Sequence, residues 1–215
     1  YELENVKGLV IYTDGSIVNK KGNKYSHGYG VIILDEKTKK PLYKFKGRFS
    51  DDAEPIINIQ LVELYAIYRA LMFVDKKINE GVFNPDINIS IKTDSNDCVV
   101  DLERHNSGSK KLSGYHYYNR NLLKEVSNLS QGKNFELSWV KGHAKDLNNR
   151  EVDSLARSGT ILKSLDEHMV FDSISKIDKQ AIVKSEEDKA PAKLIHLYLS
   201  NSENMSGFLL KSDDG

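Results

Sequence analysis

Residues 8–16 read Gly-Leu-Val-Ile-Tyr-Thr-Asp-Gly-Ser, and this stretch decides how the rest of the chain is interpreted. The apolar run at residues 9–12 predicts a short strand buried in a sheet. Such a strand would carry Asp14 to its end, where Gly15 lets the backbone turn without a Cβ penalty. A carboxylate held at a strand end by a rigid core is well placed to bind a metal, although Asp-Gly is also an ordinary turn sequence.

Length and composition favour a folded protein with one main core. The 215 residues are enough for a core domain of about 150 residues and an appendage. The hydrophobic fraction of 39% and the 11 Tyr and 7 Phe residues argue against a disordered chain. A single cysteine, Cys98, excludes an internal disulfide framework and is typical of a reducing, cytoplasmic location. We expect no membrane helix, no signal peptide and no membrane partner.

The charge of the chain is balanced overall but unevenly distributed. Lys and Arg number 31, as do Asp and Glu, so bulk charge does not favour nucleic acid. From residue 160 onward there are seven Lys and ten acidic residues, which leaves +3 on the first 159 residues. A nucleic-acid contact would therefore depend on local basic groups such as Lys110-Lys111.

Hydrophobic periodicity predicts an α/β domain. Three strands joined by short connections would form an antiparallel meander, and later strands would pair in parallel through helical crossovers. We expect a five-stranded mixed sheet flanked by helices. The predicted strands are residues 9–12, 27–34, 42–49, 87–93 and 135–140, and the predicted helices are 56–78, 96–104, 115–129 and 148–163. Residues 17–24 are polar and predict a loop.

Beyond about residue 163 the sequence changes character. We expect a catalytic domain over residues 1–163 and a C-terminal extension over residues 164–215, without a motif that assigns it a function. Residues 184–191 resemble a linker, and residues 194–199 and 208–210 predict two short strands. Because a lone hairpin is marginally stable, this extension should cover the domain, mediate self-association or dock on a protein partner.

Four acids occur where strands and helices would bring them together. Asp14 and Asp94 end predicted strands, Glu63 lies near the start of a long helix, and Asp153 lies in the last helix, ten positions after His143. Each has an ordinary interpretation: Asp94 suits a helix N-terminus, and Glu63 or Asp153 could face solvent. Their joint occurrence in this order favours a metal site.

From residue 6 to residue 158 the sequence resembles the type 1 ribonuclease H family. The resemblance rests on Thr13-Asp14-Gly15-Ser16, Glu63-Leu64-Tyr65-Ala66, Thr93-Asp94-Ser95, Trp139-Val140-Lys141-Gly142-His143 with Asn149, and Asp153 followed by Leu155-Ala156. The motifs are short, but together and in this order they are specific. The resemblance implies a ribonuclease H-like fold and hydrolysis of the RNA strand of an RNA–DNA hybrid, leaving a 5′-phosphate and a 3′-hydroxyl.

The resemblance also implies roles for the acids. Asp14 would bridge two magnesium or manganese ions about 4 Å apart, Asp153 would hold the nucleophile-side ion, and Glu63 and Asp94 the other. His143 would assist proton transfer or product departure, which its ordinary pKa near neutrality suits. Without cations, four crowded carboxylates would repel one another and have raised pKa values.

Substrate contacts carry over from the family less completely. The implied contacts are Gly15, Ser16, Asn58, Gln60, Ser95 and Asn149. Ile59 stands where many family members have an amide and cannot make that hydrogen bond, so the resemblance does not carry this contact over. Two alternatives remain: a nuclease of the same fold acting on another nucleic acid, and a non-catalytic module that binds hybrid or double-stranded RNA.

Overall fold

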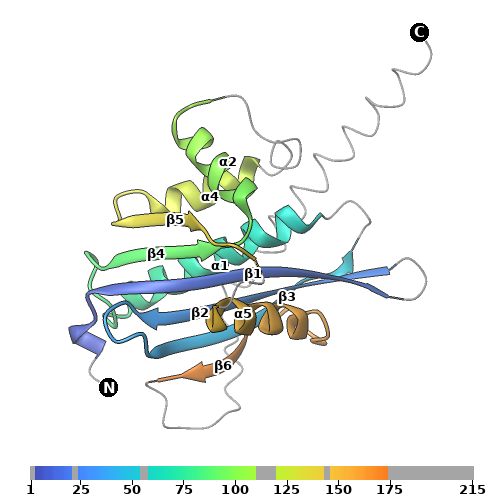
Figure 1. Ribbon diagram of the computed structural model, residues 1–215, viewed down its shortest axis with the longest axis horizontal. Coiled ribbons are helices and arrows are strands. Elements are labelled where there is room, and N and C mark those ends of the chain that lie inside the picture. Colours follow the sequence, from blue (N-terminus) through green and yellow to red (C-terminus); the bar gives the residue numbers. More distant parts are fainter. Residues whose placement is uncertain (1–2, 21–23, 54–57, 110–119, 143–145, 174–215) are drawn as a thin grey trace.

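Strand β1 (Gly8–Lys20) lies inside a single mixed sheet and carries the first acid of the predicted site (Figure 1). The computed structural model describes residues 3–20, 24–53, 58–109, 120–142 and 146–173. Successive side chains of β1 face opposite sides of the sheet. Leu9 and Ile11 belong to the larger core, and Val10 and Tyr12 belong to a smaller core. Both sets are buried because helices cover both faces of the sheet.

The sheet has six strands in the order β5-β4-β1-β2-β3-β6. β1 pairs antiparallel with β2 and parallel with β4, β4 pairs parallel with β5, and β3 pairs antiparallel with β2 and β6. The strands after β1 are β2 (Lys24–Asp35), β3 (Pro41–Ala53), β4 (Asn88–Thr93), β5 (Phe135–Trp139) and β6 (His168–Asp172).

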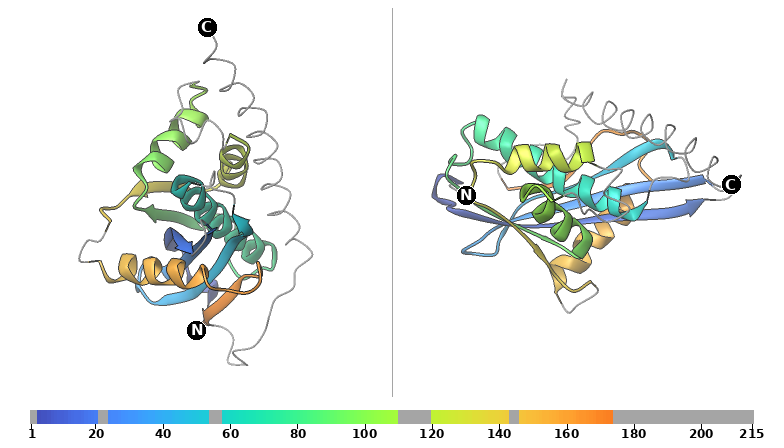
Figure 2. Two further views of the ribbon diagram at one scale, coloured as in Figure 1. Left: turned by 90° about the vertical axis from the view of Figure 1, so that its right-hand side faces the viewer. Right: turned by 90° about the horizontal axis from the view of Figure 1, so that it is seen from above.

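The helices form two layers on opposite faces of the sheet (Figure 2). Helix α1 (Ile59–Asn79) packs on β1 and β2. Helices α2 (Asn96–Asn106) and α4 (Arg120–Ser130) pack against α1 and against each other, and α2 also contacts β5. Helix α5 (Leu147–Gly159) covers the other face. A short 3₁₀ turn (Leu3–Asn5) precedes β1. Among the described residues no helix is both long and apolar enough to cross a membrane.

The predicted α/β mixed sheet is confirmed, but the predicted number of strands is wrong. The sixth strand, β6, lies in the segment assigned to the extension and pairs with the edge strand β3. Glu167 anchors the segment before β6. Its carboxylate forms a 3.1 Å ion pair with Arg69 of α1 and accepts a hydrogen bond from the Tyr29 hydroxyl. The division at residue 163 stays a prediction, and the predicted strands at residues 194–199 and 208–210 lie outside the described residues.

The predicted loop at residues 17–24 is also wrong over most of its length. β1 and β2 continue as a paired ribbon as far as Lys20 opposite Lys24. This ribbon extends beyond the layer of helices (Figure 1). Backbone pairing maintains the strands there without the apolar alternation from which a strand is predicted.

Candidate active site

Asp14 lies where β1 loses one of its two neighbours. The parallel pairing of β1 with β4 ends at Tyr12 opposite Lys92, whereas the pairing with β2 continues through Asp14 opposite Gly30. β4 ends at Thr93 and the chain turns into α2, so Asp94 is released at the carboxyl end of a parallel strand. This is the edge of an α/β sheet at which functional groups converge.

The backbone of Asp94 is held by the exposed end of the neighbouring strand. The indole Nε1 of Trp139 donates a 3.0 Å hydrogen bond to the Asp94 carbonyl oxygen. Trp139 is the last residue of β5, and its side chain is about half exposed. The contact therefore fixes the turn that follows β4.

Helix α1 brings Glu63 to the strand through a close approach at Gly15. A Cβ at Gly15 would lie 2.8 Å from the backbone nitrogen of Glu63 and 2.9 Å from the carbonyl carbon of Val62. No larger residue fits unless the helix moves, because these contacts are with backbone atoms. The start of the helix is fixed by Asn58, whose side-chain oxygen accepts a 2.9 Å hydrogen bond from the Leu61 N–H.

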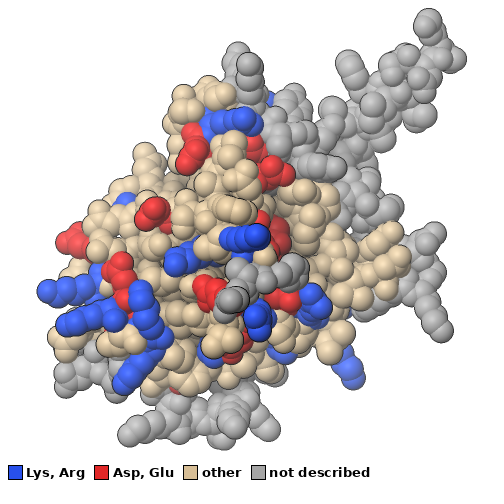
Figure 3. Space-filling view, in the orientation of Figure 1, with Lys and Arg blue, Asp and Glu red and all other residues tan. Residues whose placement is uncertain are grey.

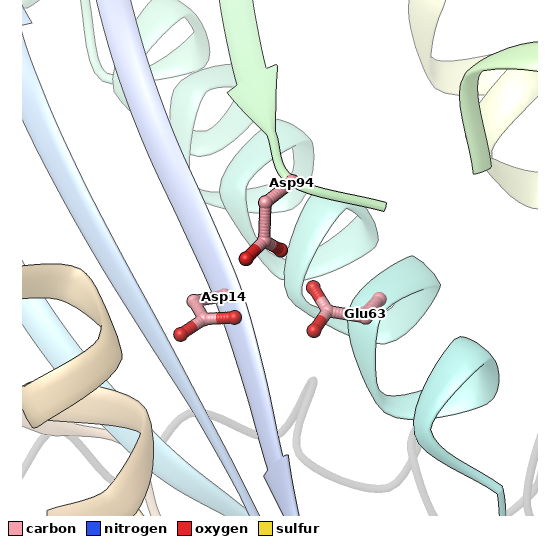
Figure 4. A group of neighbouring side chains, drawn as sticks. All are labelled: Asp14, Glu63 and Asp94. Atoms are coloured by element: carbon pink, nitrogen blue, oxygen red, sulfur yellow. The ribbon is translucent and has the colours of Figure 1, made fainter. Parts of the chain in front are cut away.

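Three carboxylates therefore face one another from three elements, as Figure 4 shows. One carboxylate oxygen each from Asp14, Glu63 and Asp94 lie within 4.8 Å of one another. Asp14 and Glu63 are only 7% and 6% exposed, so solvent screens their charges poorly. The Gly15 N–H donates a 2.9 Å hydrogen bond to Asp14 Oδ1 and partly stabilises the anion.

The electrostatics of the three carboxylates favour the binding of a positive charge. Burial, followed by the charge of Asp94, raises the pKa of Asp14 to about 7. Burial and then the charge of Asp14 raise the pKa of Glu63 well above its ordinary value. Within the described part of the chain, Glu63 Oε2 is buried without a hydrogen-bond partner.

These residues fit a hard divalent cation. Carboxylate oxygens are the ligands that magnesium and manganese prefer, and a cation would offset the repulsion that raises both pKa values. An orphaned buried oxygen on Glu63 is the kind of atom that such an ion satisfies. The predicted use of Asp14, Glu63 and Asp94 as metal ligands is consistent with this geometry.

Asp153 lies at the rim of the same site, on α5, and is about one third exposed. Its Oδ1 accepts a 2.9 Å charged hydrogen bond from Arg157 Nε, one turn later on the helix. Its charge contributes to the raised pKa of Asp14, but it is not in the group of three whose oxygens converge. The structure thus joins three of the four predicted acids directly and places the fourth beside them.

A cavity of about 380 Å³ opens over the carboxylates. It is lined by Asp14, Gly15, Ser16, Ile17, Val18, Ile59, Glu63, Asp94, Asn149, Arg150, Asp153 and Arg157. Three of the predicted substrate contacts, Gly15, Ser16 and Asn149, are in this lining. The other three, Asn58, Gln60 and Ser95, are not; Asn58 and Ser95 cap helices α1 and α2.

Several residues of the site escape prediction from the sequence. Arg150 and Arg157 line the cavity from one helix, and their separation of seven residues was the available signal. Tyr12 donates a 2.8 Å hydrogen bond to Asp146, the N-cap of α5, across 134 residues of sequence, a contact for which no local signal exists. His143 was predicted but lies outside the described residues.

The chain is similar to proteins of known family over most of its length. The family model "RNase H" matches residues 6–161. Ribonuclease H of Wolbachia pipientis wMel is 27% identical over 155 residues, covering 72% of this chain and 97% of that protein. Ribonuclease H of Ehrlichia canis is 28% identical over 155 residues, covering 72% of this chain and 96% of that protein.

Solved structures share the fold at lower identity. LC9-RNase H1, described as a type 1 RNase H with the type 2 active-site motif, is 18% identical with a TM-score of 0.58, covering 86% of this chain and 85% of that one. A foamy viral protease-reverse transcriptase in complex with RNA/DNA hybrid is 17% identical with a TM-score of 0.55, and the match covers 73% of this chain and 20% of that one. Since the family model covers most of the chain, this protein belongs to the RNase H family.

Proposed function

We propose that this protein is a divalent-metal-dependent endoribonuclease that hydrolyses the RNA strand of RNA–DNA hybrids. The observation that carries the proposal is the group formed by Asp14, Glu63 and Asp94, with oxygens within 4.8 Å, in a chain of the RNase H family. Family relatives named ribonuclease H support the reaction, and structural neighbours that were solved with RNA/DNA hybrid support the substrate.

Four residues of this chain would hold two ions, with magnesium as the first choice and manganese as the second. Asp14 has an oxygen within 4.8 Å of those of Glu63 and Asp94 and also experiences the charge of Asp153, so it would be suited to contact both ions. When bound, such ions lower the pKa of an attacking water and neutralise charge that develops on the leaving oxygen. The carboxylates need to be ionised for this work, and each raised pKa falls as positive charge enters the site.

The protein supplies position and proton transfer. Backbone contacts at Gly15 fix the distance between β1 and α1, and the Trp139 indole fixes the turn at Asp94. The site can therefore orient a scissile phosphate without first rearranging its own ligands. His143 is proposed to give a proton to the departing group, since an imidazole titrates near neutrality.

The test compares RNA–DNA, RNA–RNA and DNA–DNA duplexes of one sequence with magnesium. Cleavage of the RNA strand of the hybrid alone is expected, with 5′-phosphate ends. Cleavage of DNA–DNA would identify the alternative nuclease, and binding without cleavage would identify a non-catalytic module.

Asp14→Asn provides the matched chemical test in the same assay. Turnover should fall at least about tenfold, because the bridging charge is lost (about 1.4 kcal/mol of barrier or more). Asp86→Asn makes the same change at an exposed position between α1 and β4 and should retain wild-type turnover. If Asp14→Asn cleaved as well as Asp86→Asn, the proposed role of the carboxylates would be wrong.

A further inference from the structure

Among the described residues, two that line the cavity carry positive charge, and both come from α5. Arg150 and Arg157 face a lining that also holds four acids, Asp14, Glu63, Asp94 and Asp153. A nucleic acid approaches as a polyanion and would be repelled by those acids. On the proposed function, the cavity therefore needs cations of its own to orient the phosphates around the scissile bond.

The two arginines lie on the same side of α5. Residues seven apart are separated by nearly two full turns, and the rise between them is about 10 Å. Double-stranded DNA rises 3.4 Å per nucleotide along one strand, so a spacing of about 10 Å spans more than one nucleotide of a duplex strand. Two long side chains so placed can reach different phosphates of one strand.

The helix that carries them is held rigidly against the sheet. A Cβ at Gly28 would lie 2.4 Å from the Ala156 carbonyl oxygen, and one at Gly30 would lie 2.7 Å from the Val152 carbonyl oxygen. The backbone of α5 thus rests directly on β2. Both arginines consequently project from a fixed base, which lowers the conformational cost of binding.

Each guanidinium retains hydrogen-bonding capacity toward a ligand. Arg157 uses its Nε–H for Asp153, and its side chain is 61% exposed. An arginine has five N–H donors, so four remain for a phosphate. Arg150 is exposed, and within the described ranges its side chain takes part in no hydrogen bond or ion pair.

The apolar wall of the cavity, formed by residues of β1 and α1, has a different character. It includes Ile17, Val18 and Ile59, and the last two are more than one third exposed. These side chains can contact sugars or base edges but cannot hold phosphates. Figure 3 shows acidic and basic side chains interspersed over one face of the molecule, so binding depends on such local groups.

We propose that Arg150 and Arg157 form a phosphate-binding pair that holds the backbone of the bound strand on the α5 side of the carboxylates. The strand then lies with its phosphates toward α5 and its sugars toward the apolar wall. Arg157 additionally positions Asp153. The identity of the ligand in this inference rests on the proposed function. The capacity of the two arginines to bind an anion does not depend on it.

The salt dependence of binding tests the pair. Asp14→Asn would serve as the non-cleaving background, with a fluorescent RNA–DNA hybrid and fixed magnesium, and the dissociation constant would be measured over a series of KCl concentrations. Arg150→Ala and Arg157→Ala should each reduce the slope of log K against log salt by about 0.7 to 0.9, the value of one lost phosphate contact. Lys37→Ala removes one exposed charge at the turn between β2 and β3, away from the cavity, and should change the slope little.

Arg157→Lys separates phosphate binding from positioning. The lysine keeps the charge and should retain the wild-type slope, although it loses the planar fork toward Asp153 and should slow cleavage in an otherwise wild-type chain. An unchanged slope in either alanine variant would contradict the proposal that both arginines bind phosphates. The wild-type cleavage assay reports separately on the proposed function, because it involves neither arginine variant.

Discussion

At Asp14 and Glu63, burial and like charge act on the same oxygens. A carboxylate that is nine-tenths shielded from solvent loses hydration, and a second one beside it adds repulsion. The result is a pKa of about 7 for Asp14, well above its ordinary value. Holding these two carboxylates together therefore lowers the stability of the folded protein, as is common at functional sites.

The first prediction concerns pH without metal. The folded state holds a proton on Asp14 up to about pH 7, whereas the unfolded state releases it near its ordinary pKa of 3.8. The unfolded state therefore binds fewer protons between these values, and the contribution of Asp14 to the free energy of unfolding decreases as pH rises from about 4 to about 7. Thermal unfolding in EDTA should show this decrease when wild type is compared with Asp14→Asn.

Asp14→Asn should be the more stable protein at pH 7 in EDTA, by on the order of 1–2 kcal/mol, or a few degrees in Tm. Magnesium should reverse this order, because it binds the ionised wild-type site. Parallel curves for the two proteins across this pH range would contradict the raised pKa.

A second prediction tests the close approach at Gly15. In Gly15→Ala the new methyl group meets backbone atoms of α1, which cannot rotate away, so we expect a loss of about 1–3 kcal/mol and a marked loss of cleavage. In Gly8→Ala, on the same strand, the methyl group meets only the flexible side chain of the exposed Glu36, and stability should change little. Equal stability of the two variants would show that the helix can move.

Sequence reasoning succeeds at the residue scale where a motif is local. The predicted strand end at Asp14 is wrong, because β1 continues to Lys20 through its pairing with β2 after the pairing with β4 has ended at Tyr12. For Thr93-Asp94-Ser95, sequence reasoning does place a carboxylate directly after a strand, as in the structure. It cannot reveal that Trp139 binds the Asp94 carbonyl or that Arg157 pairs with Asp153 at 2.9 Å. Such contacts depend on rotamers and on the final spacing of elements.

At the scale of elements, α5 is positioned by polar contacts as well as by packing, and one of them joins its N-cap to β1. The Tyr12 ring is buried with Val152 and Leu155, and its hydroxyl binds Asp146 at 2.8 Å. Asp146 also accepts a 2.9 Å hydrogen bond from the Asn148 N–H, so one carboxylate both caps the helix and ties it to β1. Asn149 and Asp153 follow within two turns.

A third prediction removes this contact. Tyr12→Phe keeps the ring but leaves the cap without its partner, so we expect a loss of about 1–2 kcal/mol, measured by urea unfolding. Turnover should fall as well, because Asp153 is positioned through α5. Tyr43→Phe is the matched control: among the described residues the buried Tyr43 hydroxyl has no hydrogen-bond partner, and its removal should be neutral or stabilising. A Tyr12→Phe protein as active and stable as Tyr43→Phe would show that packing alone places the helix.

Two elements differ from prediction for physical reasons. The paired ribbon at the end of β1 and β2 is held by backbone pairing up to Lys20 opposite Lys24, and its short sequence Ile17-Val18-Asn19-Lys20 carries no sustained alternation that distinguishes it from a loop. β6 has neighbouring residues exposed on both faces, Val170 and Phe171, and its pairing partner is more than 120 residues away in β3. The long helices were predicted to within a few residues because their periodicity is strong.

For the whole molecule, the sheet does not stop where the family match stops. The match ends at residue 161, yet Glu167 pairs with the largely buried Arg69, and β6 adds an edge strand. The described part of the extension is therefore bound to the main core. Exposed apolar residues are frequent from the end of α5 into this part of the chain: Ile161, Leu165, Val170 and Phe171.

A fourth prediction compares two shortened chains. Residues 1–173 should unfold at nearly the same temperature as the full chain in magnesium. Residues 1–163 lose Glu167 and leave the Arg69 charge largely buried without this partner, which should cost about 3 kcal/mol. Both should retain cleavage at a temperature where they are folded, since among the described residues none beyond 157 lines the cavity.

Arg69→Met in the chain of residues 1–163 is the control for this comparison. It removes the buried charge that has lost Glu167 and should recover part of the loss. If both shortened chains were as stable as the full chain, β6 and Glu167 would not contribute to the core.

The repulsion among the buried acids has a consequence for laboratory evolution. A library selected for heat resistance in the absence of metal would enrich an amide at position 14 or 63, since each such change exchanges an unfavourable charge for a neutral group of the same shape. Those survivors would keep the sheet and helices but lose the metal. A selection intended to yield a more heat-resistant nuclease from this chain must therefore also select for turnover in every round.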